Sequence, residues 1–243
     1  MITASSDTLA LTVTNIIHAL DARGWTPATS SNFSWRTAEQ AQNGPGFWIS
    51  RSGVEKARFC ETDWLLYDPV TNSVTEPDAS PSAETALHTW VYGSDPTARC
   101  VLHVHSPAAV VVSRGLQSQG YLLLQGWELQ KAFAGVDSHD TPVVIPVVAN
   151  SQQMADITQA LGFAQFTAKA KAQAKTQAKT KANAPRELPD AVIARAFLIA
   201  GHGLYAWGTT PEEAYRHVMA AETLCQAELQ WQQLQGASQG GAY

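Results

Sequence analysis

Short segments of β-type composition occur between helical segments along the whole chain, but the two kinds do not alternate regularly. Stretches rich in Val, Ile, Leu, Phe and Trp have strand-like composition at residues 47–53, 61–69, 100–106, 142–149 and 197–208. Apolar spacing or helix-start residues indicate helices at residues 7–22, 80–94, 108–116, 154–163 and 210–234. A fully parallel sheet needs a regular strand–helix–strand order. The irregular order predicts a mixed α/β fold with a largely antiparallel central sheet flanked by helices.

The helix starts have specific signals. Ser80 is predicted to cap the helix at residues 80–94, with Pro81 at its first position. Thr210-Pro211-Glu212-Glu213 has the pattern of a capping box and is predicted to start the last helix, which we expect to end near Leu234.

The length suits one α/β domain, which we take as residues 1–243. Residues 168–184 differ from the rest, because they consist mainly of Ala, Lys, Gln and Thr and have no apolar face. Such a segment cannot bury surface. It is predicted to be a solvated, mobile insertion.

Composition restricts the location and the partners. The net charge is -5 and the sequence pI is about 5.8, so the chain is not expected to bind nucleic acid. No run of 18 apolar residues and no signal-peptide pattern occurs, which predicts a cytoplasmic protein without a membrane segment. Cys60, Cys100 and Cys225 are far apart and are expected to be ordinary thiols.

His103 and His105 form an His-Val-His sequence in a predicted strand. Residues two apart in a strand point to the same face, so the two imidazoles lie side by side as two metal ligands must. The alternative is a pair of polar residues on an exposed face. The apolar neighbours Val101, Leu102 and Val104 favour a buried strand, in which paired histidines need partners.

His202 is the third candidate ligand, because glycines on both sides allow another group to approach closely. A single histidine in a glycine turn is usually structural. Three histidines with an open fourth position are nevertheless the pattern of catalytic zinc, so we predict a site at His103, His105 and His202. His18, His139 and His217 lie on predicted helices or in a polar loop and are weaker candidates.

Two carboxylates are candidates for proton transfer. Glu84 lies at the start of an otherwise apolar helix, four residues before His88, and is a candidate base or fourth ligand. Its alternative role is a favourable charge in the first helical turn. Glu128 follows Trp127, an environment that can raise the pKa of an acid/base carboxyl. Its alternative role is an ion pair with Lys131.

Phosphate binding requires hydroxyls and backbone N–H groups in turns or at helix starts. Individually such turns are weak signals. The candidates for substrate binding are Asn32, Ser34, Ser52, Gly53, Lys56 and Ser82.

Seven motifs together resemble the class II (zinc-dependent) aldolase and adducin-head family. They are GWTPATSSNFS, SGVEK, PSAETALH, HVHS, QGWELQKAF, IPVVAN and GHGLYAWGTTPEEAYRHVMAAE. The resemblance implies a three-layer sandwich and one Zn²⁺ per subunit, bound by His103, His105 and His202. It also implies a homotetramer with sites near subunit interfaces, and phosphate-contacting turns at the six candidate positions.

Two segments, SGVEK and QGWELQKAF, are more similar to the dehydratase members than to the aldolases. The function implied is dehydration of 5-methylthioribulose 1-phosphate in methionine salvage, with Glu128 as acid/base. Glu84 matches the helix glutamate that is ligand and base in related aldolases. The family's TGGN-type turn is Thr29-Ser30-Ser31-Asn32 here, and residues 168–184 are outside the pattern.

Two other functions remain open. One is an aldolase or 4-epimerase acting on another ketose phosphate, because the same enediolate chemistry precedes cleavage of the C3–C4 bond. The other is a non-catalytic module like the adducin head, in which the zinc ligands are usually lost. The three histidines favour an enzyme.

Overall fold

The computed structural model describes residues 5–76, 78–164 and 190–240. The insertion expected at residues 168–184 lies outside these ranges. In the described chain the strands are β1 (Asn32–Trp35), β2 (Phe47–Ser50), β3 (Trp64–Asp68), β4 (Ser73–Val74), β5 (Cys100–Val104), β6 (Tyr121–Leu124), β7 (Val143–Val148), β8 (Val192–Ile193), β9 (Ala196–Ile199) and β10 (Gly203–Gly208).

The helices are α1 (Ser6–Asp21), α2 (Ala38–Asn43), α3 (Thr85–Ser94), α4 (Pro107–Leu116), a helix over residues 154–164 and α6 (Pro211–Gly240). Short 3-10 turns are η1 (Pro27–Thr29), η2 (Lys56–Arg58), η3 (Glu61–Asp63) and η4 (Glu128–Ala132).

The strands form one sheet in the order β4-β3-β2-β1-β5-β10-β9-β7-β6, and β8 pairs with β7. Only the pairings of β7 with β8 and β9 are parallel among the described strands. The prediction of a mixed, largely antiparallel sheet is therefore confirmed.

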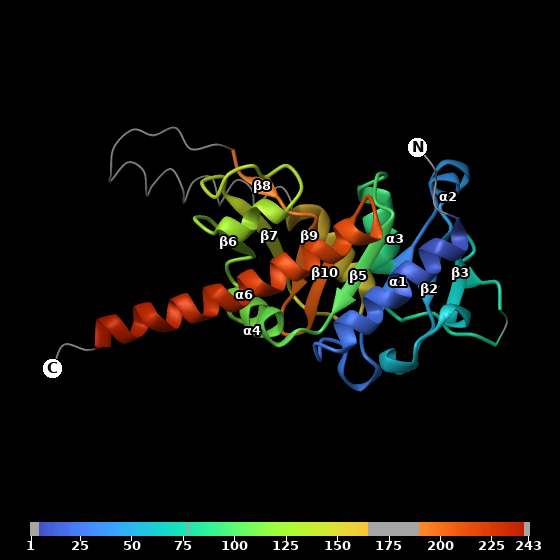
Figure 1. The fold of residues 1–243 in the computed structure, drawn as a ribbon, viewed down its shortest axis with the longest axis horizontal. Helices are drawn as coiled ribbons and strands as arrows, with labels where there is room; N and C mark the ends of the chain where they lie inside the picture. Colours follow the sequence, from blue (N-terminus) through green and yellow to red (C-terminus); the bar gives the residue numbers. More distant parts are fainter. Residues whose placement is uncertain (1–4, 77, 165–189, 241–243) are drawn as a thin grey trace.

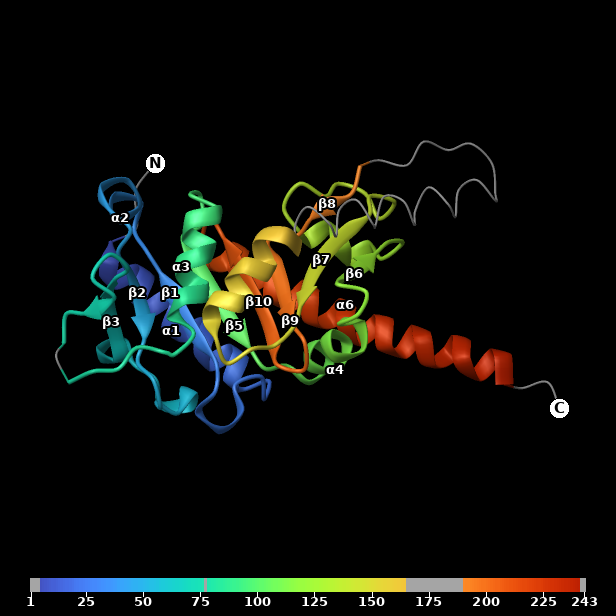
Figure 2. The same cartoon turned by 180° about the vertical axis from the view of Figure 1, so that it is seen from behind.

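Helices cover both faces of the sheet. Alternate residues of a strand point to opposite faces, so Leu198 packs under α1, α4 and α6, whereas Phe197 packs under α3 and helix 154–164. Figure 1 shows α1 and α6 crossing the first face, and Figure 2 shows α3 on the second. We call the second side the α3 face.

The alternation places the polar residues of the central strands. Phe33 and Trp35 of β1 and Leu102 and Val104 of β5 join the core under α1 and α6. Asn32, Ser34 and His103 alternate with them and therefore point to the α3 face. At the centre of the sheet, these three polar side chains therefore lie on the α3 face.

Two helix ends differ from expectation. Helix α3 begins at Thr85 rather than Pro81, because Pro81 bridges Arg51 and the Ser80 carbonyl accepts from the Ser52 amide. These contacts hold residues 80–82 in extended form beside the β2 end. Helix α6 continues past Leu234 to Gly240, over residues rich in the helix formers Gln and Ala.

The predicted start of α6 is confirmed. Thr210 Oγ1 accepts a bond of 3.1 Å from the Glu213 amide. The reciprocal bond is shifted by one residue, since the Glu213 carboxylate accepts from the amide and hydroxyl of Thr209.

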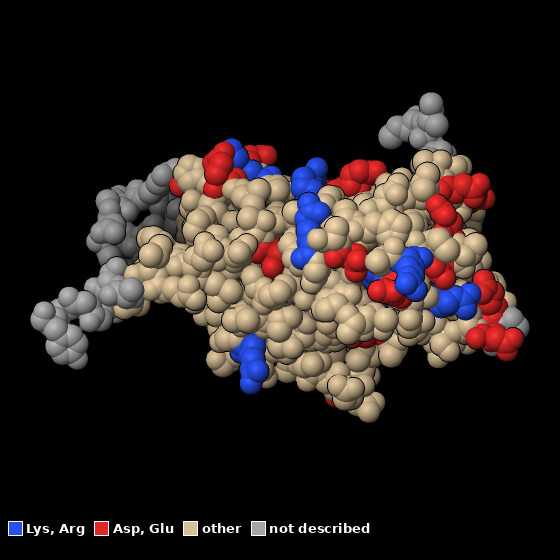
Figure 3. Space-filling model, turned by 60° about the horizontal axis from the view of Figure 1, so that its bottom comes forward, with Lys and Arg blue, Asp and Glu red and all other residues tan. Residues whose placement is uncertain are grey.

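The described surface carries no basic patch on the face drawn in Figure 3, where Lys and Arg side chains are interspersed with Asp and Glu. No helix in the described ranges has the length and apolar content needed to cross a bilayer.

Candidate metal centre

Strands β5 and β10 bring the three histidines together. Their antiparallel register pairs His103 with Tyr205 and Val104 with Leu204. His202 lies in the turn between β9 and β10, and His105 follows β5 directly, held by a bond of 2.9 Å from its amide to the Trp25 carbonyl. Segments almost 100 residues apart thus meet at one end of two neighbouring strands.

Glycine is required on both sides of His202. Gly201 has φ +66°, a left-handed conformation that side chains disfavour. A Cβ on Gly203 would lie 2.3 Å from the Val104 carbonyl oxygen and 3.1 Å from His103 Cε1. The close approach that the sequence predicted is therefore an approach of the β5 backbone and His103.

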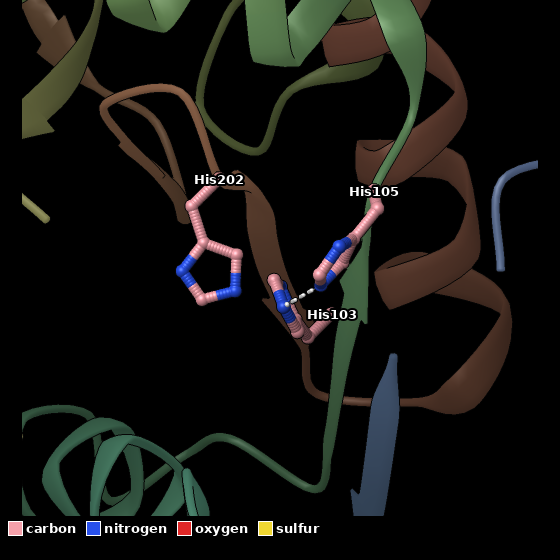
Figure 4. A group of neighbouring side chains, drawn as sticks. All are labelled: His103, His105 and His202. Atoms are coloured by element: carbon pink, nitrogen blue, oxygen red, sulfur yellow. Dashed lines mark hydrogen bonds between the residues drawn. The ribbon is translucent and has the colours of Figure 1, made fainter. Parts of the chain in front are cut away.

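The three rings face a common point, as Figure 4 shows. One ligand atom from each of His103, His105 and His202 lies within 4.8 Å of the others. The Nε2 atoms of His103 and His105 are 2.8 Å apart, and the ring centroids are 4.7–5.1 Å apart. No other such group of His, Cys, Asp or Glu occurs in the described ranges.

The surroundings keep His103 and His105 neutral and orient the His103 ring. His103 is fully buried and stacks on Tyr205 at 4.0 Å between centroids. Its Nδ1 lies 3.1 Å from the Leu204 carbonyl, which can only accept, so Nδ1 carries the proton and the Nε2 lone pair faces the cluster. Burial lowers the pKa of His103 well below its usual value and that of His105 to about 4.

The donor set fits a metal of the zinc type. Neutral imidazole is the form that binds metals. The buried Nδ1 of His202 has no hydrogen-bond partner among the described residues, while its Nε2 side is turned to the cluster. Three nitrogen ligands suit Zn²⁺, although imidazole alone does not select it over other divalent ions.

Glu84 lies against the same cluster, at the N-cap position of α3. Its Oε1 is 3.0 Å from His202 Nε2, and its Oε2 is 3.3 Å from His103 Nε2. Oε2 also accepts from the Tyr205 hydroxyl at 2.6 Å and from Asn32 Nδ2 at 2.8 Å. Burial would raise the pKa of Glu84, but the electrostatic interaction with His103 and the hydrogen bonds with His202 and Tyr205 outweigh it and lower the pKa strongly.

Ser34 does not have the predicted position. Its side chain is fully buried on the α3 face and bonds His88 Nδ1 at 2.7 Å and the Tyr92 hydroxyl at 2.9 Å. The polar partners of Ser34 thus lie inside the protein, and its position does not support the expected phosphate contact. Strand alternation turns Ser34 to the same face as Asn32, and α3 covers it there.

Lys56 lies against the turn before β1. Ala28, Thr29 and Ser31 all have φ between 54° and 73°, so the turn before β1 takes the left-handed conformation that glycine favours. Lys56 is 2% exposed, and its ammonium bonds the Thr29 and Val54 carbonyls at 3.3 and 2.9 Å. Burial lowers the pKa of Lys56.

Residues 52–53 and 82 lie close to each other. The Ser52 amide bonds the Ser80 carbonyl, and Gly53 has φ +77° in an exposed turn. Ser82 Oγ accepts from the Glu84 amide at 3.2 Å. The Asn32 amide is bonded at both ends, to Glu84 and to His88, which ties the Thr29–Asn32 turn to the histidine cluster.

Glu128 differs from expectation. Its side chain is 70% exposed in η4 and forms an ion pair with Lys131, with His139 at 3.7 Å. The Lys131 hydrogen bond lowers the pKa of Glu128, so the expected raised value is wrong and the alternative role in an ion pair is the one observed. Within the described part of one chain, no hydrogen bond or ion pair connects Glu128 to the three histidines.

The sequence did not reveal Tyr205 or Glu222. Tyr205 stacks on His103 and donates to Glu84, which follows only from the β5–β10 register. Glu222 of α6 accepts from Ser106 Oγ at 2.5 Å and from the Ala108 and Ala109 amides, so it caps α4 beside His105. No local sequence pattern predicts either contact.

A family model described as the Class II Aldolase and Adducin N-terminal domain matches residues 12–229. The chain belongs to this family. The expected family membership and three-layer architecture are thereby confirmed.

Individual relatives agree with the family assignment. Methylthioribulose-1-phosphate dehydratase of Stenotrophomonas maltophilia strain K279a is 37% identical over 234 residues, covering 96% of each chain. The protein of the same name from Xanthomonas campestris pv. campestris strain 8004 is 42% identical, covering 88% of this chain and 85% of its own. The solved L-fuculose-1-phosphate aldolase of Thermus thermophilus superposes with TM-score 0.64 and 26% identity, covering 97% of this chain and 98% of its own.

Proposed function

We propose that this chain is a lyase that dehydrates 5-methylthioribulose 1-phosphate to 2,3-diketo-5-methylthiopentyl 1-phosphate in methionine salvage. The observation that carries the proposal is the convergence of His103, His105 and His202 with Glu84 against two of them. The names of relatives at 37–42% identity support this substrate. The family match over residues 12–229 supports one catalytic domain. The proposed location is the cytoplasm.

The three histidines would hold one Zn²⁺ per subunit. The Nδ1 proton of His103, fixed on the Leu204 carbonyl, leaves Nε2 free for a metal. A bound zinc ion would supply Lewis-acid polarisation of the ketone and hydroxyl oxygens of the substrate.

Dehydration needs a base for the C3 proton and an acid for the departing C4 hydroxyl. The enol that forms then tautomerises to the diketone, and because electrons are conserved no redox cofactor is required. Glu84 is an ionised carboxylate fixed by Tyr205 and Asn32 beside the histidines, as a base or ligand must be. We retain Glu128 as acid/base and infer that it acts from a neighbouring subunit. Its side chain is exposed and makes no hydrogen bond or ion pair with the three histidines of its own described chain.

The phosphate group would bind at the turn before β1 and the loops beside it. Lys56 lies beneath this turn and contributes to the lowered pKa of His105, so it lies near both the turn and the cluster. Ser52, Gly53 and Ser82 offer hydroxyl and amide groups there. Anchoring the phosphate would hold the reacting carbons beside the histidines.

We also propose a homotetramer with sites near subunit interfaces and no nucleic-acid or membrane partner. The exposed position of Glu128 supports shared sites. A second candidate function is cleavage of another ketose phosphate, favoured by the 26% identity to an L-fuculose-1-phosphate aldolase. Cleavage would leave two smaller fragments instead of a diketone with all carbons retained.

The deciding experiment incubates zinc-loaded protein with 5-methylthioribulose 1-phosphate, identifies the products by mass spectrometry and measures bound metal. We expect the diketone phosphate from the wild type. His103→Ala should lose metal and activity together, whereas His18→Ala, a histidine exposed on α1, should keep both. Cleavage fragments would replace the dehydratase assignment by an aldolase, and metal binding without turnover would exclude this substrate.

A further inference from the structure

A chain of buried polar side chains runs from Glu84 into the layer between the sheet and α3. Asn32 Nδ2 bonds Glu84 at 2.8 Å, and Asn32 Oδ1 lies 2.5 Å from His88 Nε2. His88 Nδ1 bonds Ser34 Oγ at 2.7 Å, and Ser34 Oγ bonds the Tyr92 hydroxyl at 2.9 Å. His88 and Ser34 are fully buried, and Asn32 and Tyr92 are 5% exposed.

The direction of each bond in this chain is determined. A carboxylate only accepts, so Asn32 must turn its NH₂ group to Glu84 and its carbonyl oxygen to His88. His88 Nε2 therefore donates, which leaves Nδ1 to accept from Ser34. Burial lowers the pKa of His88 to about 3, and a neutral imidazole has the one donor and one acceptor that this arrangement needs.

The position of His88 is apolar apart from this chain. Leu87 and Val91 of the same helix pack in the core of the α3 face, where a buried imidazole is costly unless both of its nitrogens are bonded. Without the His88 donor, the buried carbonyl oxygen of Asn32 would have no partner, and the amide would be held only at its Glu84 end. Asn32 would then shift toward another donor, which weakens its bond to the Glu84 carboxylate.

We propose that His88 is a positioning residue, which bonds the Asn32 carbonyl oxygen and thereby keeps the Asn32 amide against Glu84, beside His103 and His202. Its role in turnover rests on the proposed function, but its role in placing Glu84 does not. His88 touches no substrate and acts only through Asn32.

Two substitutions separate the two bonds of His88. In His88→Gln the side-chain NH₂ reaches roughly the position of Nε2 and can still donate to Asn32. In His88→Asn the shorter side chain can accept from Ser34, as Nδ1 does, but does not reach Asn32. Thr89→Val on the same helix is the control for helix stability, because the Thr89 hydroxyl bonds the Thr85 carbonyl and interacts with Tyr67 but is not part of the chain from Glu84 to Tyr92.

The measurements are kcat and KM per bound zinc, and the visible absorption spectrum of the Co²⁺-substituted protein. For His88→Asn we expect kcat to fall roughly ten- to hundred-fold with KM little changed, and an altered Co²⁺ spectrum. His88→Gln should stay within a few-fold of the wild type in both. If His88 had only a structural role, both variants would lose thermal stability. Their kcat per bound zinc and their Co²⁺ spectra would then be the same in the Asn and the Gln variant.

A readout independent of turnover is the ¹⁵N NMR spectrum of His88 in the wild type, which should show a proton on Nε2 and none on Nδ1. The opposite tautomer, or equal Co²⁺ spectra for the Asn and Gln variants, would overturn the proposal. If the wild type does not convert the substrate, the proposed function fails while the spectra still decide the role of His88.

Discussion

At the scale of single residues, the histidine cluster depends on how closely the β5 and β10 backbones approach each other at Gly203. Gly203 lies where the β10 backbone passes the Val104 carbonyl, and even a methyl group has no room there. Tyr205, two residues later, can then stack on His103 and reach Glu84. One glycine thus determines how closely the two strands of the cluster pack.

We therefore expect Gly203→Ala to reduce the free energy of unfolding by roughly 1–3 kcal/mol, because the β5 and β10 backbones must separate. Bound zinc should fall as well, since His103 has to move. Chemical denaturation and metal analysis measure both effects.

Gly115→Ala is the matched control, because Gly115 is exposed in α4 and a Cβ there meets nothing within 4 Å. In a helix this exchange should leave stability unchanged or raise it by up to about 1 kcal/mol. If the two variants had the same free energy of unfolding, the β10 backbone could move away from β5 without loss of stability, and the expectation would be wrong.

At the scale of elements, the site depends on how helix ends join the strands. The sequence predicted the proline start of α6 correctly, since a cap is a local pattern. It misplaced the start of α3 by four residues, from Pro81 to Thr85, because the extended form of residues 80–82 comes from contacts with Arg51 and Ser52. That shift makes Glu84 the N-cap of α3 and lets its side chain reach the histidines.

Helix α4 shows the same dependence on a distant partner. Ser106 is the N-cap of α4, but its side chain accepts no bond from the amides of the first turn. Instead, the Glu222 carboxylate of α6 accepts from Ser106 Oγ and from the Ala108 and Ala109 amides. Glu222→Ala should lower the free energy of unfolding by roughly 1–3 kcal/mol, because buried donors lose their acceptor. Zinc affinity should weaken, since Ser106 follows His105.

Urea titration and competition with a metal chelator test this expectation. Glu222→Gln keeps one carbonyl oxygen and should lose less stability than the alanine variant. If alanine and glutamine behave alike and both match the wild type, the capping role assigned to Glu222 is wrong.

At the scale of the whole molecule, Glu128 raises the question of assembly. It carries the proposed acid/base role, yet its own contacts are with Lys131 and His139 on the surface. In a symmetric oligomer a surface residue of one subunit can complete the site of the next. The exposure of Glu128 is then a requirement of the assembly.

Mixing two inactive variants tests this arrangement. In oligomers assembled from equal amounts of His103→Ala and Glu128→Gln chains, about a quarter of the sites combine intact histidines with an intact Glu128 from the neighbour. We expect activity to return to about that fraction, measured after co-expression and with the oligomer mass determined by light scattering. If Glu128 acts within its own subunit, the mixture stays inactive.

By itself, the sequence determined the mixed, largely antiparallel sheet and the three histidines, because strand alternation, helix caps and the His-Val-His and Gly-His-Gly patterns are local. Tertiary structure alone decided which carboxylate meets the cluster. Asn32 and Glu84 are 52 residues apart and Tyr205 and Glu84 are 121 apart, so their contacts depend on strand order, register and the placement of α3. The same long-range packing buried Ser34 and left Glu128 at the surface, because burial depends on what covers a residue.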